Sequence, residues 1–446
     1  MPDVVVDTVR DDQKRNTVVL NGANGAPVWS ASGELLPTAN VGFSDMNRDG
    51  TPDILVTSRG EPTTADPVIA LDGLNGSRLW VAEQLDPPWQ NTYAPQSVAD
   101  LDGDGIDDWL VSTGGDDLRS PDQKPTVAGR LVVVSGADGA TVGSVEVPDG
   151  MEIYNSPVVV SDGSTSLALI GSGGEVFPGS FWGIPLEAVA ASRSREFNEL
   201  LSGYDRTSFI APPSAADLDG DGREEVVVSR LDGSVLVVDP FAADGDVVVW
   251  ESRRPALPAP EGVTGPTTSA SFTVPAIGQL DGDPALEIVV SHKGLAKDAL
   301  RAGSVTKGPM TYVVHDGATG SPQQTRTVVG GESVASPLIL RKLGTPAVLC
   351  ACVGHEEGAS LAMWTPETNV VEDLGVIGLD GSTPLLTQGM GGTTTSLLAV
   401  VRAENSDDHV AVRMDLPSTE VVWGGYLGDA HRGHFAALSP LHVGDQ

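Results

Sequence analysis

Short runs of valine, leucine and isoleucine recur along the whole chain, separated by turns rich in glycine, asparagine and aspartate. Runs of this length, bounded by turn residues, predict many short β-strands rather than helices. Four segments align with one another because an acidic loop precedes each apolar run: DMNRDGTPDILV from Asp45, DLDGDGIDDWLV from Asp100, DLDGDGREEVVV from Asp217 and QLDGDPALEIVV from Gln279. The chain therefore contains an internal repeat.

The spacing of these copies predicts further units that lack the acids. The gap between the second and third copies is about twice the other gaps, as expected if one degenerate copy lies between them. The segment SPVVVSDGSTSLALIGSG from Ser156 fills that gap, and similar two-strand segments begin at Ser336 and Ser382. A second hairpin follows the first, as in VIALDGLNGSRLW from Val68. The sequence thus predicts seven units, each a four-stranded meander.

The two ends of the chain predict an eighth unit. The N-terminal segment supplies three strands without a first strand, and the C-terminal segment HFAALSPLHVGDQ supplies a strand without a unit. Joining the ends places HVGDQ before MPDVVV, which repeats RDGTPDILV of the first acidic loop. We therefore expect an all-β fold, a single β-propeller domain over residues 1–446 with eight four-stranded blades. Residues 1–35 and 434–446 would share the closing blade, and a ring of seven blades is the alternative.

The composition supports a folded domain and limits its partners. Hydrophobic residues make up 40% of the chain, and its 53 glycines and 32 prolines are dispersed between the strand-like runs. The formal net charge of −35 disfavours nucleic acid and anionic membranes, which would repel the protein. No apolar run is long enough for membrane insertion, and we expect a monomer. The only cysteines, Cys350 and Cys352, lie two residues apart, a spacing that gives poor geometry for a mutual disulfide.

The acidic loops have the spacing of a calcium site. Oxygen-bearing side chains occupy positions one, three and five, glycine occupies position six, and a carboxylate occupies position nine. Calcium takes oxygen ligands from alternating side chains, a backbone carbonyl and a final acid, whereas an EF-hand would continue as a helix. The predicted ligands are Asp45, Asn47, Asp49, the Thr51 carbonyl and Asp53 in the first loop; Asp100, Asp102, Asp104, the Ile106 carbonyl and Asp108 in the second; and Asp217, Asp219, Asp221, the Arg223 carbonyl and Glu225 in the third.

The fourth loop departs from this pattern. It begins with Gln279, and Pro284 stands where glycine is expected. The remaining candidate ligands are Asp281, Asp283 and Glu287. We therefore expect Ca²⁺ as the cofactor, with three calcium sites and a fourth that is weak or empty, and we predict no organic cofactor.

Two repeat families resemble these segments. The acidic loops resemble the FG-GAP/VCBS repeats of integrin-α-type propellers, which implies a calcium-binding β-propeller. The following hairpins resemble the tryptophan-docking repeat of quinoprotein (PQQ-like) propellers, through Ala70, Asp72, Gly76 and Trp80 and partly through Gly25 with Trp29. This resemblance implies that the tryptophans at the ends of the hairpins pack between blades: Trp29, Trp80, Trp250 and Trp423.

The long loops predict a ligand face opposite the acidic loops. In a meander, the links between strands two and three and the links between blades lie on one face, and these links include the longest and most varied segments. The segment SRSREFNELLSGYDRTSF from Ser192 would form a lid on this face. Candidate ligand-binding cations on it are Arg10, Arg59, Arg230 and Arg402. Candidate acid–base residues are His292, His355, His431, His434 and Tyr426.

These observations leave three functions open. The leading hypothesis is a calcium-stabilised binding module that recognises a protein, a carbohydrate or a small polar ligand on the long-loop face. A lyase or cyclase with a histidine and arginine site at the channel mouth is the alternative, and a quinoprotein-like dehydrogenase is a minor one. Calcium loops of this kind fill most easily at extracellular calcium levels. We therefore expect a secreted protein whose leader is absent from this chain, or a cytoplasmic one if Met1 is the native start.

Overall fold

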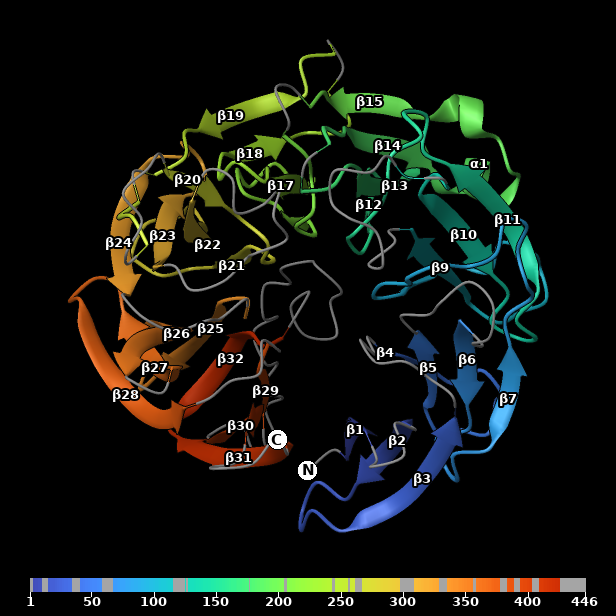
Figure 1. Cartoon of the computed structure of the whole chain (residues 1–446), viewed down its shortest axis with the longest axis horizontal. Helices are drawn as coiled ribbons and strands as arrows, with labels where there is room; N and C mark the ends of the chain where they lie inside the picture. The colour runs from blue at the N-terminus through green and yellow to red at the C-terminus, as the bar shows by residue number, and fades with distance from the viewer. Residues whose placement is uncertain are drawn as a thin grey trace, which may run out of the picture.

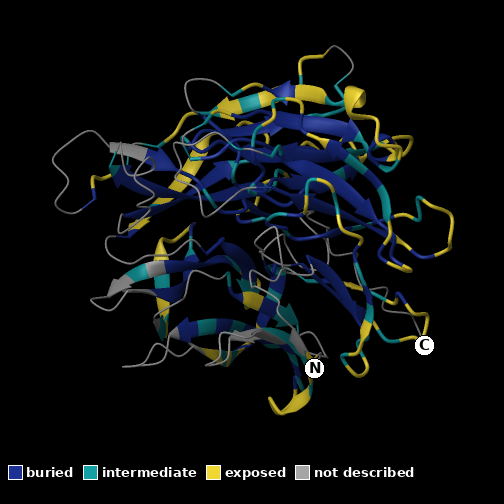
Figure 2. Ribbon diagram, turned by 45° about the vertical axis from the view of Figure 1, so that its right-hand side comes forward, coloured by how far each residue is buried: buried dark blue, intermediate teal, exposed yellow. Residues whose placement is uncertain are grey.

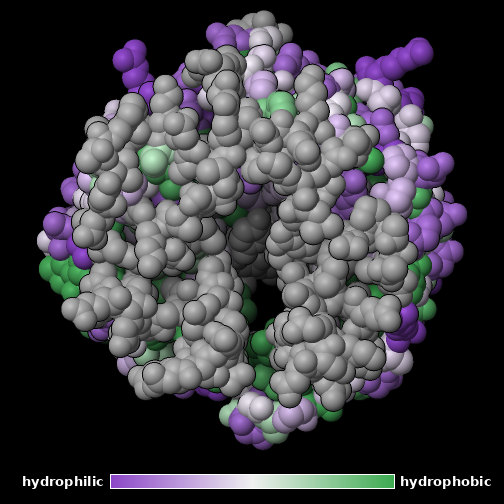
Figure 3. Space-filling model, in the orientation of Figure 1, coloured by the Kyte–Doolittle hydropathy of each residue, from purple (hydrophilic) through white to green (hydrophobic). Residues whose placement is uncertain are grey.

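The protein forms a closed ring of eight antiparallel β-sheets, shown by a computed structural model in Figure 1. This confirms the predicted all-β, eight-bladed propeller and excludes the seven-bladed alternative. The space-filling view in Figure 3 shows an opening at the centre of the ring, with hydrophobic residues beside it. The structure describes residues 3–9, 15–33, 41–57, 67–114, 125, 127–175, 177–203, 207–242, 245–255, 257–260, 267–296, 309–328, 335–355, 358–377, 383–388, 394–402 and 409–425.

The first four blades follow one another along the chain. Blade 1 contains β1 (Val4–Val9), β2 (Arg15–Leu20) and β3 (Pro27–Gly33). Blade 2 contains β4 (Val41–Ser44), β5 (Asp53–Thr57), β6 (Val68–Leu71) and β7 (Arg78–Val81). Blade 3 contains β8 (Gln96–Val98), β9 (Asp108–Thr113), β10 (Arg130–Val134) and β11 (Thr141–Glu146). Blade 4 contains β12 (Val158–Ser161), β13 (Ser166–Gly171), β14 (Phe181–Pro185) and β15 (Asn198–Leu201).

The second half of the ring is less regular. Blade 5 contains β16 (Ser214–Ala216), β17 (Glu225–Ser229), β18 (Val235–Val238) and β19 (Val248–Ser252). Blade 6 contains β20 (Thr267–Ala270), β21 (Ala276–Gly278), β22 (Glu287–Ala296), β23 (Met310–Asp316) and β24 (Pro322–Val328). Blade 7 contains β25 (Leu338–Lys342), β26 (Thr345–His355), β27 (Gly358–Thr365) and β28 (Val370–Ile377). Blade 8 contains β29 (Leu385–Gln388), β30 (Thr394–Arg402) and β31 (His409–Pro417).

Burial explains why the second and third strands read as continuous apolar runs. All residues of β5, β6, β9, β10, β17 and β18 are buried, because each of these strands packs against a neighbouring blade on both faces. Outer strands such as β19 are largely exposed. In Figure 2 the dark blue buried strands fill the body of the ring, and the exposed residues gather in turns and outer strands.

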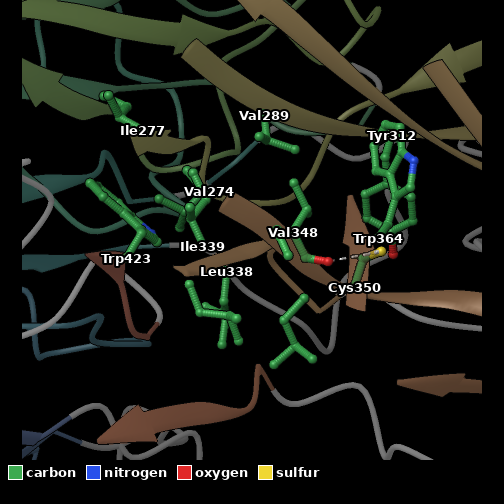
Figure 4. Close-up of a cluster of buried hydrophobic side chains, with 14 of the residues drawn as sticks. Val274, Ile277, Val289, Tyr312, Leu338, Ile339, Val348, Cys350, Trp364 and Trp423 are labelled. Atoms are coloured by element: carbon green, nitrogen blue, oxygen red, sulfur yellow. Dashed lines mark hydrogen bonds between the residues drawn. The ribbon is translucent and has the colours of Figure 1, made fainter. Parts of the chain in front are cut away.

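The last strand, β32 (Thr419–Trp423), departs from the predicted meander. It pairs with β25 of blade 7 instead of forming the outer strand of blade 8. Trp423 therefore lies opposite Ile339, fully buried in the hydrophobic cluster of blades 6 and 7 that Figure 4 shows. Its indole nitrogen has no hydrogen-bond partner among the described residues. Trp423 therefore packs between blades as predicted, but without the hydrogen bond to a turn carbonyl that the other tryptophans make.

The prediction that the cysteine spacing disfavours a disulfide is wrong. Cys350 is buried in β26 and is disulfide-bonded. A bulge in the pairing of β26 with β27, between Ala351 and Val353, breaks the regular alternation on which the sequence argument relied.

Three tryptophans join neighbouring blades as predicted. The indole N–H of Trp29 donates to the Gly73 carbonyl at 2.9 Å, that of Trp80 to Gly136 at 2.9 Å, and that of Trp250 to Gly317 at 2.7 Å. Each indole ring also covers a second glycine of the same turn, three residues after the glycine whose carbonyl accepts its hydrogen bond. An added Cβ on Gly76, Gly139 or Gly320 would lie 2.4 to 2.6 Å from the covering ring. Glycine is therefore required at these positions for its missing side chain.

The ring closes between blades 8 and 1 through a different donor. Arg413 of β31 donates from Nη1 to the Gly22 carbonyl at 2.8 Å. Gly22 stands in the turn after β2 where Gly73 stands in the turn after β6, so Arg413 replaces a tryptophan at this junction. The predicted first strand of the closing blade, residues 434–446, lies outside the described residues.

The segment from Ser192 does not form a lid. Its residues Asn198–Leu201 are β15, the outer strand of blade 4. The short helix α1 (Leu186–Ala190) precedes it, and the 3-10 helix η1 (Ser194–Glu196) lies between them. Within the described part of the chain, no helix is long and apolar enough to cross a membrane.

Candidate metal centre

Three groups of acids meet in the loops that lead into β9, β17 and β22. They are Asp100, Asp102 and Asp108 in blade 3, Asp217, Asp219 and Glu225 in blade 5, and Asp281, Asp283 and Glu287 in blade 6. In each group the ligand atoms lie within 4.8 Å of one another. Oxygen atoms bound to one calcium ion at about 2.3–2.6 Å are separated by distances of this order. The second, third and fourth predicted loops therefore bring their acids together.

The loop backbone holds these carboxylates in place. In the second loop, Asp100 accepts the N–H of Gly105 at 2.8 Å, and Asp104 accepts the N–H of Ile106 at 2.8 Å. Gly105 has a φ of +88°, which explains the glycine at position six. The third loop repeats this arrangement, with Asp217 accepting the N–H of Gly222 at 3.1 Å. The turn is thus formed by the chain itself, which presents its acids on one side.

The acid at position nine is buried in every copy. Asp108 accepts the N–H of Leu101 at 2.8 Å, and Glu225 accepts that of Leu218 at 2.7 Å. Burial, together with the neighbouring aspartates, raises the pKa of Asp108 to about 6 and the pKa of Glu225 to about 7. Burial likewise raises the pKa of Glu287 to about 7. A divalent cation beside these groups would offset the cost of burying their charge.

The fourth loop fits a cation better than its sequence indicates. Glu287 is fully buried, and its Oε2 accepts the N–H of Leu280. Its Oε1 is buried without a hydrogen-bond partner among the described residues, and Glu287 belongs to one of the three acid groups. Gln279 supports the turn, because its Oε1 accepts the N–H of Asp281 at 3.0 Å and its Nε2 donates to the Ala285 carbonyl at 2.8 Å. The Gln279 amide therefore holds the loop through hydrogen bonds at both of its polar atoms.

The first loop is organised differently. Its carboxylates do not form a three-acid group of the kind found in the other loops. Instead, the Asn47 side-chain N–H₂ lies 3.2 Å from Asp49 Oδ2, 3.4 Å from Asp53 Oδ1 and 3.5 Å from Asp72 Oδ2. Asp72, which is not one of the predicted ligands, follows β6 and begins a turn by accepting the N–H of Leu74 at 2.8 Å. The sequence feature that indicates Asp72 is an aspartate that recurs directly before a turn glycine, as in Asp316 before Gly317.

Two of the candidates predicted for the long-loop face, His292 and Arg230, lie within the described part of the chain together with their side chains. His292 lies on β22, is fully buried and packs against Gly233. Neither of its ring nitrogens has a hydrogen-bond partner among the described residues. Arg230 lies after β17 and pairs with Glu251 of the outer strand β19 at 2.7 Å. The imidazole of His292 is thus buried, and the guanidinium of Arg230 is paired with an acid.

The side chains of the remaining candidates lie outside the described part of the chain. His355 and Arg402 lie in described strands, but their side chains are outside the description. The others are Arg10, Arg59, Tyr426, His431 and His434.

Buried His292 predicts a specific loss of stability in acid. Burial, with His315 nearby, lowers the pKa of His292 to about 3, against about 6.5 in an unfolded chain. Below pH 6.5 the unfolded state binds the proton that the folded state refuses, so stability is lost as the pH falls toward 3. We expect the free energy of unfolding to fall more steeply in wild type than in His292→Leu between pH 6.5 and 5, with a difference in slope that approaches about 1.4 kcal/mol per pH unit toward pH 5. Chemical denaturation at several pH values measures this difference. The same pH dependence of the free energy of unfolding in both proteins would show that His292 is not held neutral.

Comparison with known proteins supports the fold alone. No protein-family model matches this chain, and no curated protein sequence does. The chain is similar in structure to the quinohemoprotein alcohol dehydrogenase of Comamonas testosteroni, with a TM-score of 0.52 and 11% identity over 89% of this chain and 69% of that one. A second quinohemoprotein alcohol dehydrogenase, from Pseudomonas putida HK5, gives a TM-score of 0.49 and 11% identity over 90% of this chain and 69% of that one. Similarity at this identity concerns the propeller and assigns neither cofactor nor substrate.

Proposed function

We propose that this chain is a calcium-stabilised binding module that presents its long-loop face to a protein, a carbohydrate or a small polar ligand. The observation that carries the metal assignment is the convergence of three carboxylates within 4.8 Å in each of three loops. Each group includes a buried acid at position nine. Calcium is the divalent ion whose ligand preference, oxygen atoms in a flexible loop, matches this donor set.

The position of the loops indicates a structural role for the ion. Each acid group lies in the loop before an inner strand of its blade, and its last acid is the first residue of that strand: Asp108 in β9, Glu225 in β17 and Glu287 in β22. An ion held there ties the inner hairpin of the blade to its loop. Ligand recognition is then left to the opposite face, where the links between strands two and three emerge.

The enzyme hypotheses receive no support from the described residues. His292 is inaccessible to a substrate because it is fully buried, and Arg230 is engaged by Glu251. Similarity to a quinohemoprotein alcohol dehydrogenase at 11% identity concerns the fold and assigns no cofactor site. We therefore keep the binding module as the single proposed function.

Removing one acid from each group tests the metal assignment. We expect the Asp102→Asn, Asp219→Asn and Asp281→Asn substitutions each to remove one calcium ion per chain in a calorimetric titration of metal-stripped protein. Asparagine keeps the shape of the side chain and its hydrogen bond to the loop N–H while it removes the charge.

Asp162→Asn is the matched control. Asp162 occupies the corresponding turn of blade 4, which lacks the acid group, and it accepts the N–H groups of Ser164 and Thr165. We expect this variant to bind as much calcium as wild type. Wild-type protein without measurable calcium binding, or three loop variants with unchanged stoichiometry, would contradict the metal assignment.

A further inference from the structure

Two glycine peptides connect a metal-loop acid to a tryptophan of the preceding blade. At Gly136, the carbonyl accepts the indole N–H of Trp80 at 2.9 Å, and the N–H donates to Asp108 Oδ1 at 3.2 Å. At Gly73, the carbonyl accepts the indole N–H of Trp29 at 2.9 Å, and the N–H donates to Asp53 Oδ1 at 3.0 Å. The acid belongs to one blade and the tryptophan to its neighbour.

Close packing makes each connection rigid. An added Cβ on Gly136 would lie 2.1 Å from the carbonyl oxygen of Asp107, the residue before the acid. An added Cβ on Gly73 would lie 1.9 Å from the carbonyl oxygen of Pro52, which precedes Asp53. These glycine peptides are thus pressed against the backbone that carries the acid. A shift of the acid therefore displaces the peptide, and a shift of the peptide displaces the acid.

The ring closure contains a third example of the same connection. The Gly22 carbonyl accepts a hydrogen bond from Arg413 of blade 8, and its N–H donates to Asp3 Oδ1 at 3.0 Å. Asp3 stands before β1 as Asp53 stands at the start of β5. A charged donor thus replaces the indole while the acid and the peptide are kept.

The loops that end in glutamate lack this connection. In blade 6, Trp250 donates to the Gly317 carbonyl, but the Gly317 N–H donates to the Leu286 carbonyl at 2.9 Å and not to Glu287. In blade 5, Pro240 occupies the position of the glycine, and proline has no N–H to donate. Aspartate at position nine therefore accompanies the connection, and glutamate accompanies its absence.

We propose that Trp80 is a positioning residue for the calcium site of the second loop, and that calcium binding there strengthens the docking of blade 2 on blade 3. This inference rests on the proposed calcium binding. A hydrogen bond that orients a metal ligand raises metal affinity, and the indole N–H polarises the peptide that makes this bond. Because coupling between two sites is reciprocal, an ion that fixes Asp108 also fixes the peptide on which Trp80 docks.

Replacing Trp80 by phenylalanine tests the coupling. Phenylalanine keeps an apolar ring in the docking site and removes the N–H donor. In titrations of metal-stripped protein with calcium alone, we expect Trp80→Phe to weaken one site by about 5-fold, at the lower end of typical coupling between sites. Trp250→Phe is the matched control, because its glycine peptide does not contact a carboxylate, and we expect it to leave every calcium affinity unchanged.

A double-mutant cycle separates positioning from a general loss of structure. In the Asp102→Asn background, where the second site is removed, we expect Trp80→Phe to have no further effect on the remaining sites. An effect that persists in this background, or an equal effect of Trp250→Phe, would overturn the coupling. If wild-type protein binds calcium and Trp80→Phe binds it equally well, only the coupling fails. If wild type binds none, the proposed function itself fails.

A measurement on the wild-type protein covers the case in which Trp80→Phe does not fold. Calcium is expected to shift the indole N–H resonance of Trp80 in nuclear magnetic resonance spectra, and to leave that of Trp250 nearly unchanged. This shift should be absent in Asp102→Asn. Equal shifts of both indoles, or none at Trp80 in protein that binds calcium, would contradict the inference.

Discussion

Saturating calcium is expected to raise the melting temperature of metal-stripped protein by on the order of 10 °C. A ligand that binds only the folded state stabilises it by about 2.7 kcal/mol when its concentration is 100 times the dissociation constant. Three independent sites would then contribute about 8 kcal/mol. The effect should be large because each group contains a buried acid, such as Glu287 with an unpaired oxygen, whose charge is costly without a cation.

Thermal unfolding monitored by circular dichroism would measure this shift. Chelation should reverse it, and magnesium should replace calcium poorly because it requires a smaller and more regular octahedral site. The combined Asp102→Asn, Asp219→Asn and Asp281→Asn variant should melt at the same temperature with and without calcium. A melting temperature of wild-type protein that is insensitive to both chelation and added calcium would refute the stabilising role.

The fold was predictable because its signal is repeated. The spacing of the acidic loops and the glycine turns appears several times, so an irregular copy such as the one from Ser156 is identified by its neighbours. The split unit at the N-terminus was also visible, and β1 to β3 form the three-stranded sheet that it implied. Tryptophan docking at Gly73, Gly136 and Gly317 followed from the resemblance to another propeller repeat.

Features decided by contacts between units were not predictable. The strand β32 has the apolar pattern of an outer strand, yet it pairs with β25, and nothing in its own sequence specifies that partner. Segment Asn198–Leu201 has helical propensity but completes blade 4, because a free sheet edge gains more from pairing than the segment gains from a helix.

The metal loops show the same limit at the level of single residues. The spacing indicated that the first loop was complete and the fourth defective. The structure brings together the acids of the fourth loop, and in the first loop the amide of Asn47 lies beside Asp49 and Asp53. Ligand geometry depends on how an amide is oriented, and position in a motif does not determine this orientation. The link from Asp108 through Gly136 to Trp80 joins three segments and was likewise hidden.

Gly139→Ala is expected to destabilise the protein by about 3 kcal/mol, well beyond the cost of the turn conformation alone. Gly139 has a φ of +79°, where an alanine costs about 1–2 kcal/mol. Its added Cβ would also lie 2.6 Å from the ring of Trp80, and such overpacking costs about 1–3 kcal/mol more. Gly25 offers the matched control, because it has a φ of +72° in the corresponding turn of blade 1, with nothing within 4 Å of its added Cβ.

Gly25→Ala should therefore show the conformational cost alone, about 1 kcal/mol, in chemical denaturation followed by circular dichroism. The difference between the two variants measures how tightly blade 2 is docked on blade 3. Because the extra cost arises from contact with the indole, it should shrink when Trp80 is replaced by alanine in the Gly139→Ala background. Equal destabilisation by Gly139→Ala and Gly25→Ala would mean that the Trp80 ring moves aside without cost. The junction between blades would then be too loose to transmit a displacement of Asp108 to its neighbour.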